Sequence, residues 1–554
     1  MARDTLSILD GSTFVVSDRR GDIDAAPNRL HGLFYRDTRF LSRWRLTLDS
    51  HSLDVLSTDE VDYFSTQFFL VPATGTIYSN PSLSVIRQRY VGDGFHEDVI
   101  ILNHAQEPAA IRVRLQAMAD FADLFEVKDA LHKKGELYQE VRDGQLVLGY
   151  RRDDFVRETS IWASAAAEVT QDELTFDIQV PPHGEWTTCL EVSPRAEKAV
   201  RIKYNPHESI RPRPNMAGSL EAWLSKAPTL ETDWDDLRHI YRRSLIDLAA
   251  LRFYPDGAPP GASLPAAGLP WFMALFGRDS LITSYQTLPF APELAATTLR
   301  LLAARQGQRV DDFRDEEPGK ILHELRVGEL THFRERPHSP YYGSADATPL
   351  FLVLLDEYER WSGDVDLVNE LEPNAHAALE WIDRYGDRDG DGYVEYERHN
   401  TQTGLENQCW KDSWNSILFA DGSLAKLPRA TCEIQGYVYD AKRRCARLAR
   451  QVWSDHALAE RLEREAAELK TRFNRDFWLP GREFFALALD GDKRPVDTLT
   501  SNIGHLLWSG IVDQDKAAYI VSHLMGDRLF SGWGVRTMAE GEGGYSNGAG
   551  SVHG

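Results

Sequence analysis

The hydrophobic pattern of the chain changes its period once, between residues 201 and 230. Before this segment, apolar and polar residues alternate, as they do over residues 44–48, 111–115 and 174–180. A period of two is typical of strands that bury one face, and no helical pattern interrupts these runs. We therefore predict an N-terminal antiparallel β-sandwich over residues 1–200.

After residue 230 the period is helical. Residues 237–251, 434–452 and 458–473 carry apolar side chains three and four positions apart, as amphipathic helices do. Residues 350–355 are apolar throughout, which is typical of a helix buried on all sides. Roughly nine or ten helices, joined by long polar and aromatic loops, favour an α/α toroid over residues 231–554 with its site at one mouth.

The segment between the two periods is expected to be a linker. Residues 201–230 contain Pro206, Pro212, Pro214 and Pro228, and neither period continues through them. A chain of 554 residues also exceeds what one hydrophobic core usually organises. We therefore expect two domains joined by this surface segment.

The charge balance restricts the partners of the protein. The chain has 85 acidic and 62 basic residues, a net charge of −23, and no basic run. Nucleic acid and anionic membranes are therefore poor partners, whereas a neutral substrate meets no electrostatic penalty. An apolar signal segment and a stretch of about 20 apolar residues are both absent from the sequence. We expect a soluble, cytoplasmic protein whose oligomeric state the sequence leaves open.

The cysteines indicate neither disulfides nor a metal. The four are Cys189, Cys409, Cys432 and Cys445, with no CxxC pair and no Cys/His spacing typical of zinc ligands. We expect a reducing compartment, no metal and no cofactor. Cys409 and Cys432 flank polar motifs, but they are interpreted as small buried apolar groups.

The most informative motif is Asn-Gln-Cys-Trp-Lys-Asp-Ser-Trp at residues 407–414. Its one carboxylate, Asp412, stands beside Lys411 and between Trp410 and Trp414. Aromatic neighbours desolvate a carboxyl group and raise its pKa, as a general acid requires, while a lysine lowers it. The setting suits an acid that acts on a flat, hydroxyl-rich substrate such as a sugar.

A second motif lies at residues 268–280. Trp271 and Phe272 could form an aromatic platform for a sugar ring, and Arg278 and Asp279 could bind its neighbouring hydroxyls. The competing interpretation is a helix N-terminus with Asp279 as a first-turn charge.

Two further segments concentrate polar residues at 323–329 and 341–348. The first contributes His323, Glu324 and Arg326 as sugar-binding candidates, and the second contributes Tyr342 and Asp346. Adjacent His and Glu lack the spacing of a zinc protease motif, so a metal is disfavoured. Structural roles explain the second segment nearly as well, with Ser344 as an N-cap and Asp346 as a helix-dipole partner.

Two other acidic features have structural alternatives. Glu433 begins a strongly patterned helix, where a first-turn acid is common, but it is also the nearest candidate partner for Asp412. Residues 387–395 resemble the start of a calcium loop. However, the twelfth position is Arg398, which excludes an EF-hand and favours a tight turn over a calcium site.

Together these motifs resemble the bacterial amylo-α-1,6-glucosidase, or glycogen debranching enzyme-like, family. The resemblance covers nearly the whole chain. It rests on residues 14–22 and 31–42 in the first part and on residues 276–280, 323–329, 342–348 and 408–413 in the second. It implies an N-terminal β domain followed by an (α/α)6 catalytic domain.

The resemblance also implies an activity. It indicates an inverting glycoside hydrolase acting on α-1,6-linked or related α-glucosides of glycogen-like oligosaccharides. Asp412 would protonate the leaving oxygen, and the other motifs, with Trp410 and Lys411, would hold the non-reducing-end glucose. Inversion needs a second carboxylate about 6.5–9.5 Å from the acid. In the family this base lies in a segment beyond residue 554, so we expect an incomplete toroid.

Two functional expectations follow. As an enzyme, the chain would be weakly active or inactive unless Glu433 or a partner chain supplies the base, because losing one of an acid/base pair costs about 10²–10⁴ in rate. The alternative is a non-catalytic carbohydrate-binding protein. An interaction or storage protein without a sugar site is disfavoured by the dense Trp, Arg and Asp loops.

Overall fold

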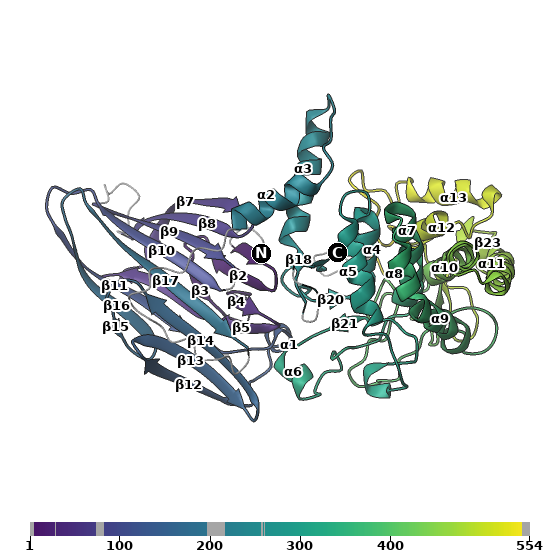
Figure 1. Ribbon diagram of the computed structural model, residues 1–554, viewed down its shortest axis with the longest axis horizontal. Coiled ribbons are helices and arrows are strands. Elements are labelled where there is room, and N and C mark those ends of the chain that lie inside the picture. The colour runs from purple at the N-terminus through teal and green to yellow at the C-terminus, as the bar shows by residue number, and fades with distance from the viewer. Residues whose placement is uncertain are drawn as a thin grey trace. The chain divides into compact units, whose positions relative to one another are not determined.

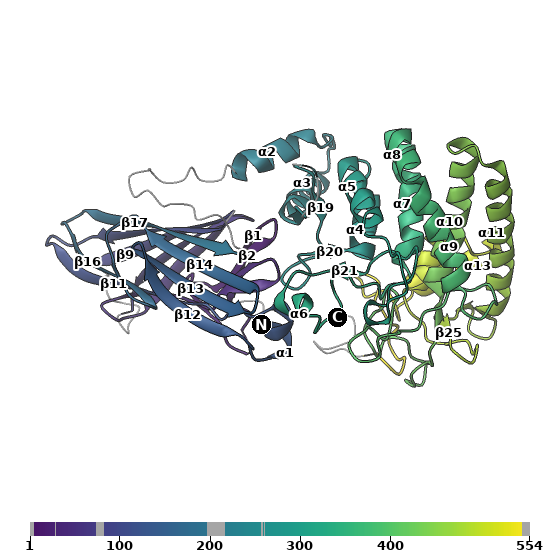
Figure 2. The ribbon, with the colours of Figure 1, turned by 60° about the horizontal axis from the view of Figure 1, so that its bottom comes forward.

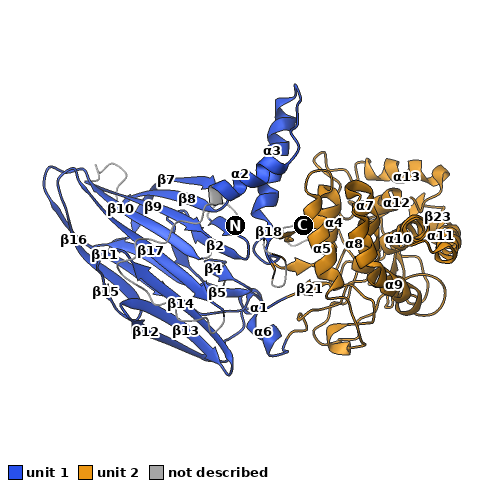
Figure 3. Ribbon diagram, viewed as in Figure 1, with its two compact units in different colours: residues 1–254, 268–273, 326–335 blue, residues 255–267, 274–325, 336–554 orange. Residues whose placement is uncertain are grey.

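The computed structural model describes residues 5–27, 29–73, 82–92, 94–196, 216–255, 259 and 261–545. The chain divides into two compact units (Figure 3). Unit 1 comprises Met1–Tyr254, Gly268–Met273 and Arg326–Glu335, and unit 2 comprises Pro255–Ala267, Ala274–Leu325 and Arg336–Gly554. Among the described residues, no helix is long and apolar enough to cross a membrane.

Unit 1 is an antiparallel β-sandwich, which confirms the predicted fold class (Figure 1). One sheet has the strand order β12-β13-β14-β17-β10-β9-β8-β7, a second β15-β16-β11-β6-β3, and a third β1-β2-β4-β5. The strands are β1 (Thr5–Asp10), β2 (Thr13–Asp18), β3 (Ile23–Asp24), β4 (Gly32–Tyr35), β5 (Thr38–Leu41), β6 (Arg43–Leu48), β7 (Leu53–Asp62), β8 (Ser65–Pro72), β9 (Leu83–Val91), β10 (Phe95–Asn103), β11 (Ala109–Met118), β12 (Glu136–Arg142), β13 (Gln145–Arg152), β14 (Phe155–Ala163), β15 (Glu168–Val169), β16 (Glu173–Val180) and β17 (Glu185–Arg195).

The alternation seen in the sequence becomes one face of a sheet. The three runs that predicted strands are β6, β11 and β16, which are neighbours, and Leu115 lies opposite both Leu46 and Leu174. Since residues two apart in a strand point to the same side, these side chains share one buried face. They form a single core with apolar residues of the eight-stranded sheet, such as Phe68 and Val99.

A charged cluster lies inside this apolar core. The Glu97 carboxylate accepts hydrogen bonds from Arg87 Nη2 at 2.9 Å, Arg89 Nε at 2.8 Å and Trp44 Nε1 at 3.0 Å. The side chains of Arg87, Arg89 and Glu97 have no exposed surface. Arg87 also donates to Asp22 Oδ1 at 2.7 Å, which adds a second carboxylate to the cluster. Buried charges of this kind persist only when paired.

The predicted linker falls partly outside the described residues, which resume at residue 216. From there the chain forms α2 (Met216–Lys226) and α3 (Asp235–Ala250), both in unit 1. Trp223 Nε1 donates to the Leu245 carbonyl at 3.0 Å and ties the two helices together. Helix α2 was not predicted from the sequence, and the domain boundaries at residues 200 and 230 remain predictions.

Unit 2 is built from helical hairpins in series. Its helices are α4 (Gly277–Thr287), α5 (Pro292–Ala303), α7 (Ala347–Ser362), α8 (Val365–Glu370), α9 (Glu372–Trp381), α10 (Cys432–Gln451), α11 (His456–Asp476), α12 (Ile503–Ser509) and α13 (Gln514–Leu524). Helices α4, α7, α10 and α12 contact one another in that order. A second set of helices packs against this row, in the pairs α5 with α4, α9 with α7, α11 with α10, and α13 with α12. We call α4, α7, α10 and α12 the inner helices.

The remaining elements are short. In the chain they are α1 (Leu124–Asp129), β18 (Arg252–Phe253), β19 (Leu264–Pro265), β20 (Leu275–Phe276), the 3₁₀ turn η1 (Asp312–Arg314), β21 (Glu324–Leu325), α6 (Glu329–His332), the π turn η2 (Ile382–Gly386), β22 (Ala430–Thr431), β23 (Trp478–Leu479), β24 (Phe484–Phe485) and β25 (Ala488–Leu489). All six residues of the apolar run 350–355 are buried in α7, as its composition predicts.

The connections of unit 2 alternate in length. Those within the hairpins are short, such as residues 288–291 and 452–455, whereas residues 387–429 and 490–502 lead into the N-termini of inner helices. The long connections gather at one end of the helices (Figure 2). Every inner helix therefore starts at this end. The motifs that precede these helices, or lie in their first turns, converge there.

Candidate active site

Arg278 lies at the centre of the converging motifs. It occupies the first turn of α4, and Nη1 donates to Asp346 Oδ2 and to the Cys409 carbonyl, each at 3.0 Å. Nη2 donates to Asp412 Oδ2 at 3.2 Å. A planar guanidinium can hold several acceptors in fixed directions. Arg278 thus joins two inner helices to the motif at residues 407–414.

The turn before Arg278 depends on Gly277. A Cβ atom at this position would lie 2.0 Å from the Leu322 carbonyl oxygen. The Gly277 N–H donates to the His323 carbonyl at 2.8 Å, and β20 pairs with β21 next to it. The close backbone approach explains why a glycine precedes the arginine.

The carboxylates around Arg278 differ in exposure. Asp346 is fully buried and accepts a hydrogen bond from Ser344 Oγ at 2.5 Å, while 36% of the Asp412 side chain is exposed. Asp279 is half-buried in the first turn of α4. Burial lowers the pKa of Arg278, but Asp346, Asp279 and Asp412 together raise it well above its ordinary value. Arg278 is therefore a permanent cation, and Asp412 is the partner that solvent reaches.

His323 and Glu324 line the same region. The His323 ring lies edge-on to Phe276, with ring centres 5.7 Å apart. Burial lowers the pKa of His323, against the opposing effect of Glu324, so its imidazole is neutral near pH 7. Glu324 Oε1 lies 2.9 Å from His338 Nε2, and both side chains are 9% exposed. His338 was not singled out from the sequence.

Lys411 turns away from solvent. Its side chain is buried, and Nζ donates to the Thr537 carbonyl. Burial lowers the pKa of Lys411 to about 8, although the negative charge of Glu433 opposes this shift. Lys411 thus ties the loop at residues 407–414 to the backbone of Thr537, and its role as a sugar-binding residue stays a prediction.

Glu433 lies in the first turn of α10. It is fully buried, and its Oε1 has no hydrogen-bond partner of ordinary geometry among the described residues, although Asn502 and Thr431 are near enough to favour its charged form. Burial raises the pKa of Glu433, with Asn502 acting in the opposite direction and Asp346 in the same one. A buried carboxyl group with a raised pKa is common at functional sites. The role of Glu433 as the base stays a prediction.

Trp410 contacts residues that sequence reasoning missed. Its ring centre lies 5.3 Å from that of His505 on α12, and Tyr437 Oη lies 2.8 Å from His505 Nδ1. Burial lowers the pKa of His505 to about 4, so the ring is neutral near pH 7. The Tyr437 and Trp508 rings are 5.8 Å apart and extend this aromatic group. The i, i+3 spacing of His505 and Trp508 was the only signal of it in the sequence.

A cavity of about 320 Å³ adjoins this aromatic group. It lies between α4, α7 and α12, and its lining includes Tyr285, Leu350, Val353, His505 and Trp508. The walls are mainly apolar, as in most small-molecule sites. His505 belongs both to the cavity and to the neighbourhood of Trp410.

The other predicted sugar-binding residues have different surroundings. Trp271, Phe272 and Arg326 belong to unit 1, where Arg326 Nη1 donates to Asp37 Oδ1 at 2.9 Å and Nη2 to the Trp271 carbonyl at 2.6 Å. Phe272 is 45% exposed. Tyr342 in unit 2 is buried and donates to the Arg305 carbonyl at 2.7 Å. The structure thus gives Arg326 and Tyr342 structural partners.

The acidic loop at residues 387–395 contains an internal cation. Lys493 Nζ lies 2.8 Å from Asp389 Oδ2 and 2.5 Å from Asp391 Oδ2. The Gly390 N–H donates to Asp387 Oδ1 at 2.9 Å, closing the turn. The lysine supplies the positive charge that calcium would otherwise bring, in agreement with the interpretation as a turn.

Two protein families match the chain. Residues 8–191 match the N-terminal domain of (some) glycogen debranching enzymes, and residues 276–548 match the mannosylglycerate hydrolase MGH1-like glycoside hydrolase domain. Both matches agree with the family resemblance of the motifs. No curated protein matches the chain.

Solved structures also match at low identity. A rhamnosidase from Klebsiella oxytoca with rhamnose bound is 13% identical, with a TM-score of 0.41, and the match covers 87% of this chain and 79% of that chain. A putative kojibiose phosphorylase from human microbiome is 10% identical, with a TM-score of 0.49, covering 87% of this chain and 69% of that chain.

Proposed function

We propose that this chain, in which an N-terminal domain of the glycogen debranching enzyme type is joined to an MGH1-like glycoside hydrolase domain, hydrolyses α-1,6-linked or related α-glucosides of glycogen-like oligosaccharides. The glycoside hydrolase domain makes the chain a glycosidase-type enzyme with a carbohydrate substrate. The proposed hydrolysis is supported mainly by the partly exposed Asp412 carboxylate, whose Oδ2 accepts a hydrogen bond from Arg278 Nη2 at 3.2 Å.

In this proposal Asp412 is the general acid. Protonated Asp412 gives its proton to the glycosidic oxygen as the bond to the anomeric carbon breaks. Arg278 fixes the direction of the carboxyl group, and Trp410 offers an apolar ring face on which a pyranose can stack. A carboxylate opposite Asp412 then activates the water that attacks from the other side.

Glu433 is the proposed base. Its position in the first turn of an inner helix, where the polar motifs converge, supports this assignment. Its full burial opposes the assignment, since the water must reach it and the carboxyl must lose its proton. Asp279, half-buried in the first turn of α4, is a second candidate, because its charge acts on Arg278 together with those of Asp346 and Asp412.

That burial also favours a second candidate function, carbohydrate binding without hydrolysis. One experiment distinguishes the two. Purified protein is titrated with maltooligosaccharides and α-1,6-branched oligosaccharides by calorimetry, and glucose release is measured on the same samples. Heat of binding with glucose release supports the hydrolase, whereas binding without product supports the binding protein. If the titration gives no heat of binding and no glucose is released, both proposals are contradicted.

A further inference from the structure

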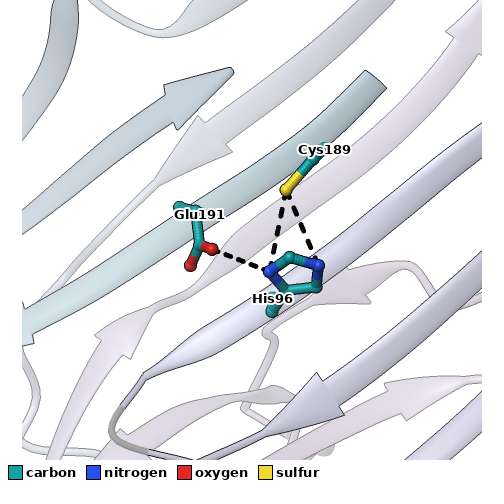
Figure 4. Close-up of side chains that lie close together, drawn as sticks. All are labelled: His96, Cys189 and Glu191. Atoms are coloured by element: carbon teal, nitrogen blue, oxygen red, sulfur yellow. Dashed lines mark hydrogen bonds and ion pairs between the residues drawn. The ribbon is translucent and has the colours of Figure 1, made fainter. Parts of the chain in front are cut away.

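A group of metal-binding side chains lies on the β-sandwich of unit 1, apart from the residues discussed above. His96 is on β10, and Cys189 and Glu191 are on the neighbouring strand β17 (Figure 4). His96 lies directly opposite Glu191, and Asp98 lies opposite Cys189. All four residues therefore share one face of the eight-stranded sheet, because side chains two apart point to the same side.

The three side chains are close enough to share one ion after a small rearrangement. Glu191 Oε1 lies 2.8 Å from His96 Nδ1, and Cys189 Sγ lies 3.7 Å from Nδ1 and 3.6 Å from Nε2, so the thiol must rotate toward Nδ1 to bind the same ion. Zinc bonds of about 2.0 Å to nitrogen and about 2.3 Å to sulfur, at a tetrahedral angle, separate the two ligand atoms by roughly 3.5 Å. One ligand atom from each of the three residues lies within 4.8 Å of the others. The carboxylate needs to shift by only about half an ångström to admit a metal.

The second ring nitrogen of His96 has the partner that a metal ligand requires. His96 Nε2 lies 3.2 Å from Asp98 Oδ1. A histidine that binds a metal through one nitrogen commonly donates its other N–H to a carboxylate, which fixes the ring orientation. Asp98 is placed for this supporting role, and Nδ1 is left to face Glu191, with the Cys189 thiol at nearly equal distances from both ring nitrogens.

The surroundings also suit a specific site. His96 is 9% and Cys189 7% exposed, and 27% of the Glu191 side chain is exposed. Two of the three proposed ligands are therefore shielded from bulk water, and solvent reaches the third.

We propose that His96 Nδ1, Cys189 Sγ and Glu191 form a binding site for a zinc-like divalent transition metal, oriented by Asp98. Imidazole, thiolate and carboxylate together are typical zinc ligands, and three protein ligands leave a fourth position for water. The sequence led us to expect no metal, because His96 is 93 positions from Cys189 and only the strand register brings them together.

Cobalt(II) binding to the full chain tests this site. Cobalt(II) substitutes for zinc, and its thiolate charge-transfer absorption reports a Cys ligand directly. After treatment with a chelator and a reductant, we expect one equivalent of cobalt to produce this absorption and one equivalent of zinc to remove it. Absence of the thiolate band would overturn the proposal.

Variants assign the ligands. Cys189→Ser should abolish the thiolate band, and Asp98→Asn should weaken zinc binding about 10–100-fold, the effect typical of an outer-shell carboxylate. His104→Ala, in the same domain, and Glu185→Gln, on the same strand, are matched controls for His96→Ala and Glu191→Gln. Circular dichroism verifies that each variant is folded. Metal binding that persists in folded His96→Ala and Cys189→Ser would overturn the proposal.

Discussion

Arg278 Nη2 on α4 lies 3.2 Å from Asp412 Oδ2 in the loop before α10, while Nη1 of the same guanidinium lies 3.0 Å from buried Asp346. One side chain thus links a buried carboxylate to an exposed one. Because Asp346 has no exposed surface, it fixes Arg278, and Arg278 in turn orients Asp412. The position of the proposed acid is therefore set from the core of unit 2.

The first prediction concerns this link. In Arg278→Lys a single ammonium cannot span Asp346, the Cys409 carbonyl and Asp412 together, so we expect Asp412 to lose its fixed direction. A misplacement of about 1 Å costs about 10² in rate, so kcat should fall by that order. Arg300→Lys is the matched control, because Arg300 contacts Glu370 at an exposed site. Unchanged kcat in folded Arg278→Lys would contradict the positioning role.

The second prediction concerns Lys411 and pH. Its pKa is lowered to about 8 from the ordinary 10.5. Between about pH 8 and pH 10.5 the unfolded chain therefore binds more protons than the folded chain, so the free energy of unfolding rises with pH in this range. Relative to Lys411→Met, the free energy of unfolding of the native protein should increase by about 2 kcal/mol between about pH 7.5 and pH 9.5. Urea denaturation at both values measures it, and a pH-independent difference would refute the burial of a charged Lys411.

A third prediction concerns the core of unit 1. Glu97→Gln leaves the guanidinium groups of Arg87 and Arg89 without their shared buried carboxylate. Breaking a buried ion pair typically costs about 3–5 kcal/mol, so the free energy of unfolding of unit 1 should fall by that amount and its urea midpoint should move to lower denaturant. Glu60→Gln on the exposed strand β7 is the control and should change little. Equal midpoints for the two variants would argue against a stabilising role of the cluster.

The fourth prediction tests Glu433 as the base. Burial raises the pKa of Glu433 above its ordinary 4.5, and a base must be ionised. The rate should therefore increase with pH through a value above 4.5, and Glu433→Gln should remove this limb and lower kcat about 10²–10⁴-fold. Asp279→Asn provides the comparison. If Asp279→Asn removes the limb and Glu433→Gln does not, Asp279 is the base.

Much of this architecture could be predicted from local patterns. Alternation identified β6, β11 and β16 because each buries one face, and the apolar run of α7 indicated burial on all sides. Arg278, Asp346 and Asp412 could be proposed together because each lies in a dense polar motif. Their meeting follows from the inner helices all starting at one end of unit 2.

Other features depend on contacts that no local pattern contains. His505 reaches Trp410 because α12 packs on α10, and the intervening chain gives no hint of that pairing. Glu97 occupies an inward position of a strand, where alternation predicts an apolar residue. His96 and Cys189 are brought together by strand register alone. Helix α2 lies in a segment whose prolines favoured a linker.

The role of Asp412 as the general acid can be tested through the leaving group of the substrate. The dinitrophenolate group of an aryl α-glucoside leaves without being protonated. The leaving sugar oxygen of an α-1,6-linked oligosaccharide needs a proton. We therefore measure kcat/KM of native protein and Asp412→Asn on both substrates, with exposed Asp421→Asn as the control. We expect Asp412→Asn to lose about 10²–10⁴-fold in kcat/KM on the oligosaccharide and to retain most activity on the aryl glucoside. Full retention on the oligosaccharide, or equal loss on both substrates, would contradict it.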